Sequence, residues 1–205
     1  MRRVILSLAV AATLTAAVAG LPTAQAHRGA TDDNRQSEAL RFKADLAPLN
    51  VDGRGRGRVK LEQQDGELAV KLRAKGLDDG IHLAHIHGIR QAENECPGMS
   101  FDVDDNGVVD IAEGLPAYGP VQITLSDGLN DRGTSLDYTR TFTVLDGGDA
   151  LSALGDLSDY AIVIHGVDLD GDDLATNPNA GGDAAGDPDD NEISMPALCG
   201  TIEGH

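Results

Sequence analysis

Three histidines in two separate segments have the spacing of ligands for a transition metal. His85 and His87 are one residue apart, so in a strand both imidazoles would point to the same face and could share one ion. Two neutral imidazoles suit copper or zinc but leave the coordination incomplete. His165, at the end of the apolar run 161–165, is the candidate third ligand. Two alternatives stay open: a hydrogen-bonded core role for His165, and plain polar strand positions for all three.

A second group of candidate ligands lies in the loop that follows Cys96. Residues 102–113 match the twelve-residue EF-hand loop, with Gly107 at the position of the sharp turn. The oxygen ligands of the pattern would be Asp102, Asp104, Asn106, the backbone carbonyl of Val108, Asp110 acting through water, and Glu113. The flanking residues, with Pro97 before and Pro116 after, have no helical pattern. We therefore expect a stand-alone calcium loop with a structural role, the alternative being an acidic loop without an ion.

The chain is strongly acidic, with a formal net charge of -18. No Lys or Arg follows Arg140, whereas acidic residues continue to Glu203. Nucleic acids and anionic membranes need clustered cations, so the charge balance argues against both as partners. The acidic residues either form a solvated surface or bind cations. The long loop 167–195 is rich in Asp and Gly but fits no complete motif, so we expect it to be mobile.

The N-terminus has the order of a secretory signal peptide. Arg2 and Arg3 precede an apolar run, and the small-residue step 24–26 follows it, which predicts removal of residues 1–26. The alternative is a membrane anchor, since the run approaches the length of a bilayer span. After cleavage we expect no stable membrane insertion and a secreted protein, extracellular or in the cell envelope. The only two cysteines, Cys96 and Cys199, would then pair as a disulfide, unless both remain free thiols.

Short strand-like segments fill most of the remaining chain. Residues 40–46 alternate apolar and polar side chains, and 59–61 and 68–72 flank the turn dipeptide Asp65-Gly66 as a hairpin. Further strands are predicted at 81–87, 121–125, 138–144, 160–166 and 197–202. A short helical stretch is predicted near 150–157. We expect an all-β domain at 40–205, an antiparallel Greek-key sandwich or barrel of about eight strands, after a flexible leader at 27–39.

Four of these motifs together resemble the copper/zinc superoxide dismutases. The run Gly80-Ile-His-Leu-Ala-His-Ile-His87 is similar to the segment in which two copper ligands follow a histidine by three and five residues. Residues 161–166 resemble the later strand that carries another copper ligand, and Cys96 with the run 197–202 resembles the disulfide and last strand. A weaker resemblance, mainly the pentapeptide Ala-His-Ile-His-Gly, connects the chain to the secreted CHRD domains, which carry no enzymatic expectation.

The dismutase resemblance implies roles for four histidines. His85, His87 and His165 would bind copper and carry any catalysis, and His82 would position the strand. No histidine lies between Gly88 and Ile164, so the bridging and zinc-binding histidines of the family are missing and a zinc site is not expected. The family's active-site arginine falls at Pro196.

Two functions remain after this comparison of motifs. The leading hypothesis is a secreted copper protein with superoxide dismutation as its candidate activity. The alternative is a non-catalytic secreted β-domain, CHRD-like or dismutase-derived, that binds calcium and could also bind or store copper. The sequence leaves the oligomeric state open.

Overall fold

The computed structural model describes residues 38–51, 53–88, 93–169, 171, 175 and 192–205. The chain divides into two units, residues 1–35 and 36–205, and the second contains all of the described residues. The predicted signal peptide at 1–26 and nearly all of the leader at 27–39 lie outside the described part. So does most of the long acidic loop at 167–195.

The described residues form an antiparallel β-structure with few helices, as the sequence predicts. The strands are β1 (Leu40–Pro48), β2 (Arg56–Gln64), β3 (Glu67–Lys75), β4 (Ala84–His87), β5 (Val121–Thr124), β6 (Ser135–Phe142), β7 (Ala161–His165), β8 (Pro196–Thr201) and β9 (Glu203–Gly204). One α-helix is present among them, α1 (Ile111–Tyr118). Short 3-10 helices are η1 (Met99–Phe101), η2 (Gly128–Asn130), η3 (Leu151–Leu154) and η4 (Leu157–Asp159).

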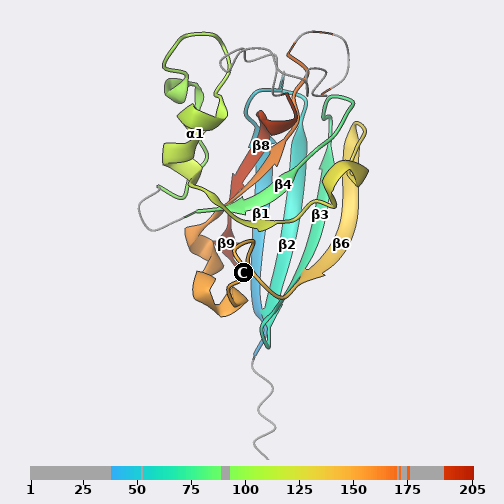
Figure 1. Cartoon of the computed structure of the whole chain (residues 1–205), viewed down its shortest axis with the longest axis vertical. Coiled ribbons are helices and arrows are strands. Elements are labelled where there is room, and N and C mark those ends of the chain that lie inside the picture. Colours follow the sequence, from blue (N-terminus) through green and yellow to red (C-terminus); the bar gives the residue numbers. More distant parts are fainter. Residues whose placement is uncertain (1–37, 52, 89–92, 170, 172–174, 176–191) are drawn as a thin grey trace, which may run out of the picture. The chain divides into compact units, whose positions relative to one another are not determined.

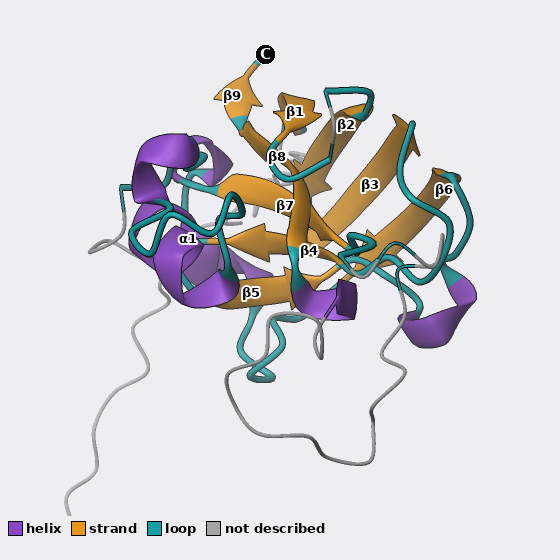
Figure 2. Ribbon diagram, turned by 90° about the horizontal axis from the view of Figure 1, so that it is seen from above, coloured by secondary structure: helices purple, strands orange, loops and turns teal. Residues whose placement is uncertain are grey.

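The strands join into one curled sheet with the order β5-β4-β7-β8-β1-β2-β3-β6, and β9 pairs with β1 beside this path. Figure 1 shows β1, β2, β3 and β6 side by side, and Figure 2 shows the sheet curling into a half-barrel. The eight strands on the path agree with the predicted number. All the strand pairs are antiparallel, so the all-β class is confirmed.

The hairpin of β2 and β3 forms at the predicted turn. Asp65 and Gly66 have φ values of 52° and 83°, the left-handed conformation that an Asp-Gly dipeptide tolerates. The inward positions of both strands are apolar and buried, including Val59 and Leu61 on β2 and Leu68 on β3. Alternation therefore gives this part of the sheet one face in the core and one face in solvent.

A partly buried arginine on β6 connects the two ends of the path, β6 and the end of β5. The guanidinium of Arg140, on β6, donates hydrogen bonds to both carboxylate oxygens of Asp131 at 2.5 and 2.7 Å, and to the carbonyl of Leu125 at 3.0 Å. It also lies 3.8 Å from the ring centroid of Tyr138. Leu125 directly follows β5, so this one side chain connects the segments at the two ends of the sheet.

A disulfide joins Cys96 to Cys199, as predicted, with an S–S distance of 2.09 Å. It fastens the segment before α1 to β8. Two local predictions need correction: the strand expected from residue 81 begins at Ala84, and the helical stretch near 150–157 forms two 3-10 helices. Among the described residues, no helix is long and apolar enough to span a membrane.

Candidate metal centre

Neighbouring strands bring the three predicted histidines together. β4 carries His85 and His87, and β7, which pairs with β4, ends at His165. One ligand atom from each imidazole lies within 4.8 Å of the others. The ring centroids are 5.1 to 5.6 Å apart. This cluster has the size of a three-imidazole metal site, so the residues predicted from two distant motifs do converge.

Backbone carbonyls fix which nitrogen of two histidines can bind an ion. Nδ1 of His87 lies 2.7 Å from the carbonyl of Gly119, and Nδ1 of His165 lies 2.5 Å from the carbonyl of Ser194. A carbonyl can only accept, so each Nδ1 carries the hydrogen and each Nε2 of the neutral ring has a free lone pair. The two Nε2 atoms face each other at 3.4 Å. Two lone pairs at this distance repel, and a cation between them would remove that repulsion.

His85 offers a third nitrogen without a protein partner. Its Nδ1 is buried and accepts or donates no hydrogen bond, although the ring as a whole is partly exposed. A buried polar atom without a partner costs free energy, about 1–3 kcal/mol, unless something else fills the position. The residues therefore fit a soft or borderline divalent ion, because three imidazole nitrogens converge and none of them needs to lose a protein hydrogen bond.

Burial keeps these imidazoles neutral. Desolvation lowers the pKa of His87 to about 4, and the nearby His85 contributes in the same direction. Desolvation also lowers the pKa of His165 to about 3, with both neighbouring imidazoles adding to the effect. The pKa of His85 is lowered by burial and raised in part by the carboxylate of Asp146. At neutral pH the cluster thus presents lone pairs rather than positive charges.

His82 is fully buried, and the hydrogen-bond partners of its ring nitrogens are backbone carbonyls. Its Nδ1 lies 3.0 Å from the carbonyl of His165, and its Nε2 lies 3.0 Å from Asp78 and 2.9 Å from Gly133. Gly166 has φ 111° and packs so closely that a Cβ there would lie 2.5 Å from the imidazole. His82 therefore links the end of β7 to two other loops, and its positioning role stays a prediction.

A carboxylate stands beside the exposed side of the centre. Thr124 pairs with His85 in the sheet, and its backbone N–H and hydroxyl donate to Asp146 at 2.8 and 2.7 Å. The residue that pairs with His165 on β8 is Pro196, which carries no charge. The described surroundings of the histidines therefore include one carboxylate, and a proline occupies the position at which the dismutase resemblance implies an arginine.

Two residues that sequence reasoning missed support His87. The ring of Tyr118 packs edge-on against His87 with centroids 4.8 Å apart, and the following residue, Gly119, accepts the hydrogen bond from His87. Tyr118 is fully buried beside the Cys96–Cys199 disulfide. Both residues lie at the end of α1, which the sequence pattern did not predict.

The acidic loop is folded around three of its predicted ligands. Carboxylate oxygens of Asp102, Asp104 and Glu113 lie within 4.8 Å of one another. Asp102 accepts from the backbone N–H groups of Asn106 and Gly107 at 3.1 and 2.9 Å, which curls the loop around these carboxylates.

Two other predicted ligands have local partners. The amide oxygen of Asn106 accepts from the backbone N–H of Val108 at 2.9 Å. Asp110 caps the N-terminus of α1 by accepting from Glu113, and Glu113 accepts from Asp110 in return. The expectation of a non-helical flank is thus wrong after the loop, while η1 before it is a single 3-10 turn.

No protein-family model matches this chain.

Proposed function

We propose that this protein binds copper through His85, His87 and His165. The observation that carries the proposal is the pair of Nε2 lone pairs that face each other at 3.4 Å, with one ring nitrogen of His85 within 4.8 Å of the ligand atoms of the other two histidines. Imidazole nitrogen is a good ligand for copper and zinc alike. The resemblance to the dismutase motifs favours copper, and the missing zinc histidines argue against an additional site for zinc.

Superoxide dismutation is the candidate activity of this centre. Bound copper would supply one-electron redox chemistry. The chain's own contribution would be to hold three neutral imidazoles in place, through the carbonyls of Gly119 and Ser194, and to leave one side of His85 open to solvent. His82 would act as a positioning residue through its contact with the carbonyl of His165.

A non-catalytic copper-binding role is the second candidate, and the charges near the centre favour it. Asp146 lies beside His85, and the chain carries a net charge of -18. Such a field slows the approach of an anion and favours the approach of a metal cation. On this second reading the protein is a secreted copper-binding or copper-storage module, and superoxide is not its substrate.

The acidic loop is proposed to bind calcium and to serve the structure. Its three clustered carboxylates are hard oxygen ligands, which calcium prefers, and they lie on a folded turn that leads directly into α1. We further propose export of the protein after removal of residues 1–26. The Cys96–Cys199 disulfide supports an oxidising compartment.

The test uses protein expressed from His27 onward, loaded with copper and desalted. Copper content is read by mass spectrometry and superoxide removal is measured on the same sample. The wild type should keep about one copper per chain, His165→Ala should lose it, and the matched control His205→Ala, an exposed histidine, should keep it. Copper with activity supports the dismutase, copper without activity supports the binding module, and loss of copper in neither variant refutes the site.

A further inference from the structure

Half of the positive charges of this acidic chain lie on one face of the sheet. Eight of the 16 Lys and Arg residues are outward-facing on β1, β2 and β3: Arg41, Lys43, Arg56, Arg58, Lys60, Lys71, Arg73 and Lys75. Five carboxylates share this face, from Asp45, Glu62, Glu67, Asp137 and Glu203. The face therefore has a formal side-chain charge of +3, and the remainder of the chain, at a total of -18, has -21.

Along β2 and β3 the cations stand directly opposite one another in three successive pairs. The register pairs Arg56 with Lys75, Arg58 with Arg73, and Lys60 with Lys71. Like charges directly opposite across two strands destabilise a sheet. Folding alone therefore does not account for this arrangement. A ligand that neutralises the positive charges would account for it.

The middle pair of arginines is neutralised within the protein. Arg58 contacts Asp45 at 2.7 Å, and Arg73 contacts Asp137 at 3.2 Å. These carboxylates lie on the outer neighbouring strands β1 and β6. They show that carboxylate groups fit the spacing of cations on this face.

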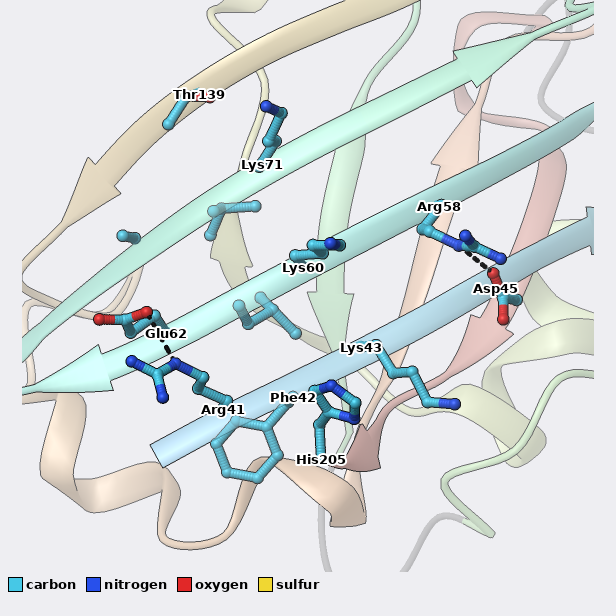
Figure 3. A pocket seen from close by; sticks show the side chains of 13 residues that line it. Arg41, Phe42, Lys43, Asp45, Arg58, Lys60, Glu62, Lys71, Thr139 and His205 are labelled. Atoms are coloured by element: carbon cyan, nitrogen blue, oxygen red, sulfur yellow. Dashed lines mark hydrogen bonds and ion pairs between the residues drawn. The ribbon is translucent and has the colours of Figure 1, made fainter. Parts of the chain in front are cut away.

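The lysine pair has no such partner. Among the described residues, no carboxylate lies within ion-pair distance of Lys60 or Lys71. Lys43, the third lysine of this row, stands opposite Lys60 and is held by Glu203 at 3.2 Å. Figure 3 shows Lys60 and Lys71 in a shallow pocket of the sheet face, with the Arg58–Asp45 and Arg41–Glu62 ion pairs on either side.

Hydroxyl groups border the lysines, and among the described lining residues the one exposed ring is the imidazole of His205, so the face has no row of rings. Thr139 stands opposite Lys71, and Thr141 is the next outward residue on β6. Phe42, the one phenyl ring of the lining, is buried. Single-stranded nucleic acids are bound on stacking rings. A polymer that carries carboxylates and hydroxyl groups matches this surface better. The lysines can pair with its carboxylates, and the lysines and threonines can hydrogen-bond to its hydroxyl groups.

The dimensions of the face suit an extended polymer. Neighbouring strands are about 4.8 Å apart, and alternate residues along a strand are about 7 Å apart, so the six cations of β2 and β3 form a strip two strands wide and about 14 Å long. We propose that this face binds an acidic polysaccharide whose charged groups are carboxylates, a polyuronate, with the Lys60–Lys71 pair as its main contact. The proposal is independent of the metal centre.

The probe is polygalacturonate, titrated calorimetrically into the full exported chain at low salt, with Lys60→Gln and Lys71→Gln compared with Arg132→Gln. Arg132 is exposed and off this face, so its variant makes the same change in net charge. Each lysine variant should weaken binding about two- to fivefold, a range typical of exposed ion pairs, and the double variant about tenfold. Lys60→Arg and Arg132→Gln should bind as the wild type does, and added salt should weaken all of them.

Three results would overturn the proposal. The first is no binding of polygalacturonate by the wild type, and the second is an equal loss of binding in Arg132→Gln and the lysine variants. The third is equal or tighter binding of heparin or a short oligothymidylate, which would show simple ion exchange or another class of polyanion. Thermal unfolding of each variant separates these results from misfolding, because Lys60 and Lys71 are exposed and their replacement should leave the fold intact.

Discussion

Acid is expected to unfold the metal-free protein through its buried histidines. Burial lowers the pKa of His87 to about 4 and that of His165 to about 3, whereas both would titrate near 6.5 in the unfolded chain. Between these values the unfolded chain binds protons that the folded chain does not. The free energy of unfolding must therefore fall as pH falls from about 6.5 to 4, and it is fully restored above about pH 7.

The size of the effect at pH 5 depends mainly on the unfolded chain. Both folded pKa values lie below 5, so each imidazole is still neutral in the folded protein at pH 5. This pH is about 1.5 units below the pKa of each imidazole in the unfolded chain. One unit corresponds to about 1.4 kcal/mol, so each histidine costs about 2 kcal/mol and the two together about 4 kcal/mol. The pKa of His85 shifts in the same direction. Small domains are stable by only about 5–15 kcal/mol, so this loss is large.

Urea unfolding followed by circular dichroism, at pH 7.5, 6, 5.5 and 5 with a chelator present, measures the effect. His87 and His165 account for two protons, so between pH 5 and 5.5 the free energy of unfolding should change by at least about 2.7 kcal/mol per pH unit. His87→Gln should lower this slope by about 1.4 kcal/mol per pH unit, and His205→Gln, which changes an exposed imidazole, should leave it unchanged. A wild-type stability that is flat from pH 7.5 to 5, or a slope that His87→Gln leaves intact, would refute the reasoning.

Three further predictions concern the loop, the disulfide and α1. Calcium should raise the free energy of unfolding by about 2.7 kcal/mol at a concentration 100 times its dissociation constant, measured by thermal melts. Glu113→Gln should abolish this rise, while its amide oxygen preserves the helix cap. Replacing Cys96 and Cys199 by Ser opens a link of sequence separation 103 and should cost about 4–5 kcal/mol in urea unfolding. Gly114→Ala should destabilise the fold and reduce copper retention in the desalting assay, because a Cβ there would collide with the ring of the buried tyrosine. Gly98→Ala, where a Cβ meets nothing within 4 Å, is its control, and a Gly114→Ala variant as stable as this control would contradict the packing argument.

The strands were predictable because their signals are local. The Asp65-Gly66 turn and the alternation on either side fix β2 and β3 without any distant contact. The same period of two places His85 and His87 on one face. Bringing His165 to them requires the pairing of β4 with β7, which is a contact between segments far apart in the chain. Periodicity alone does not specify that pairing, so the third ligand depended on the resemblance of motifs.

The support around the histidines was not predictable, because it consists of backbone atoms. The partners of the imidazole Nδ1 atoms are the carbonyls of Gly119 and Ser194, and any residue type offers a carbonyl. Asp146 lies in the loop after β6, and its hydrogen bonds to Thr124 hold it near the metal centre. Which acidic residue of a strongly acidic chain lies next to a ligand depends on the path of the loops, and composition does not determine this.

The helix α1 was missed because Gly114 and Pro116 lie inside it, and both residue types disfavour a helix interior. It forms because the reciprocal Asp110–Glu113 cap satisfies its first turn and its last residue, Tyr118, is fully buried. The spacing of Asp110 and Glu113 fits a helix capping box, and this was the signal for α1 in the sequence. Both residues were instead interpreted as calcium ligands.

Through this helix the two candidate sites are physically connected. α1 begins within the acidic loop and ends at Gly119, which accepts the hydrogen bond of His87. A second connection runs through Asn50, whose side chain bonds the backbone of Val109 in the loop and the carbonyl of Pro196 on β8. Pro196 pairs with His165. A displacement of the loop would therefore reach both histidines whose lone pairs face each other, so the geometry of the metal centre depends on a segment that contributes no ligand to it.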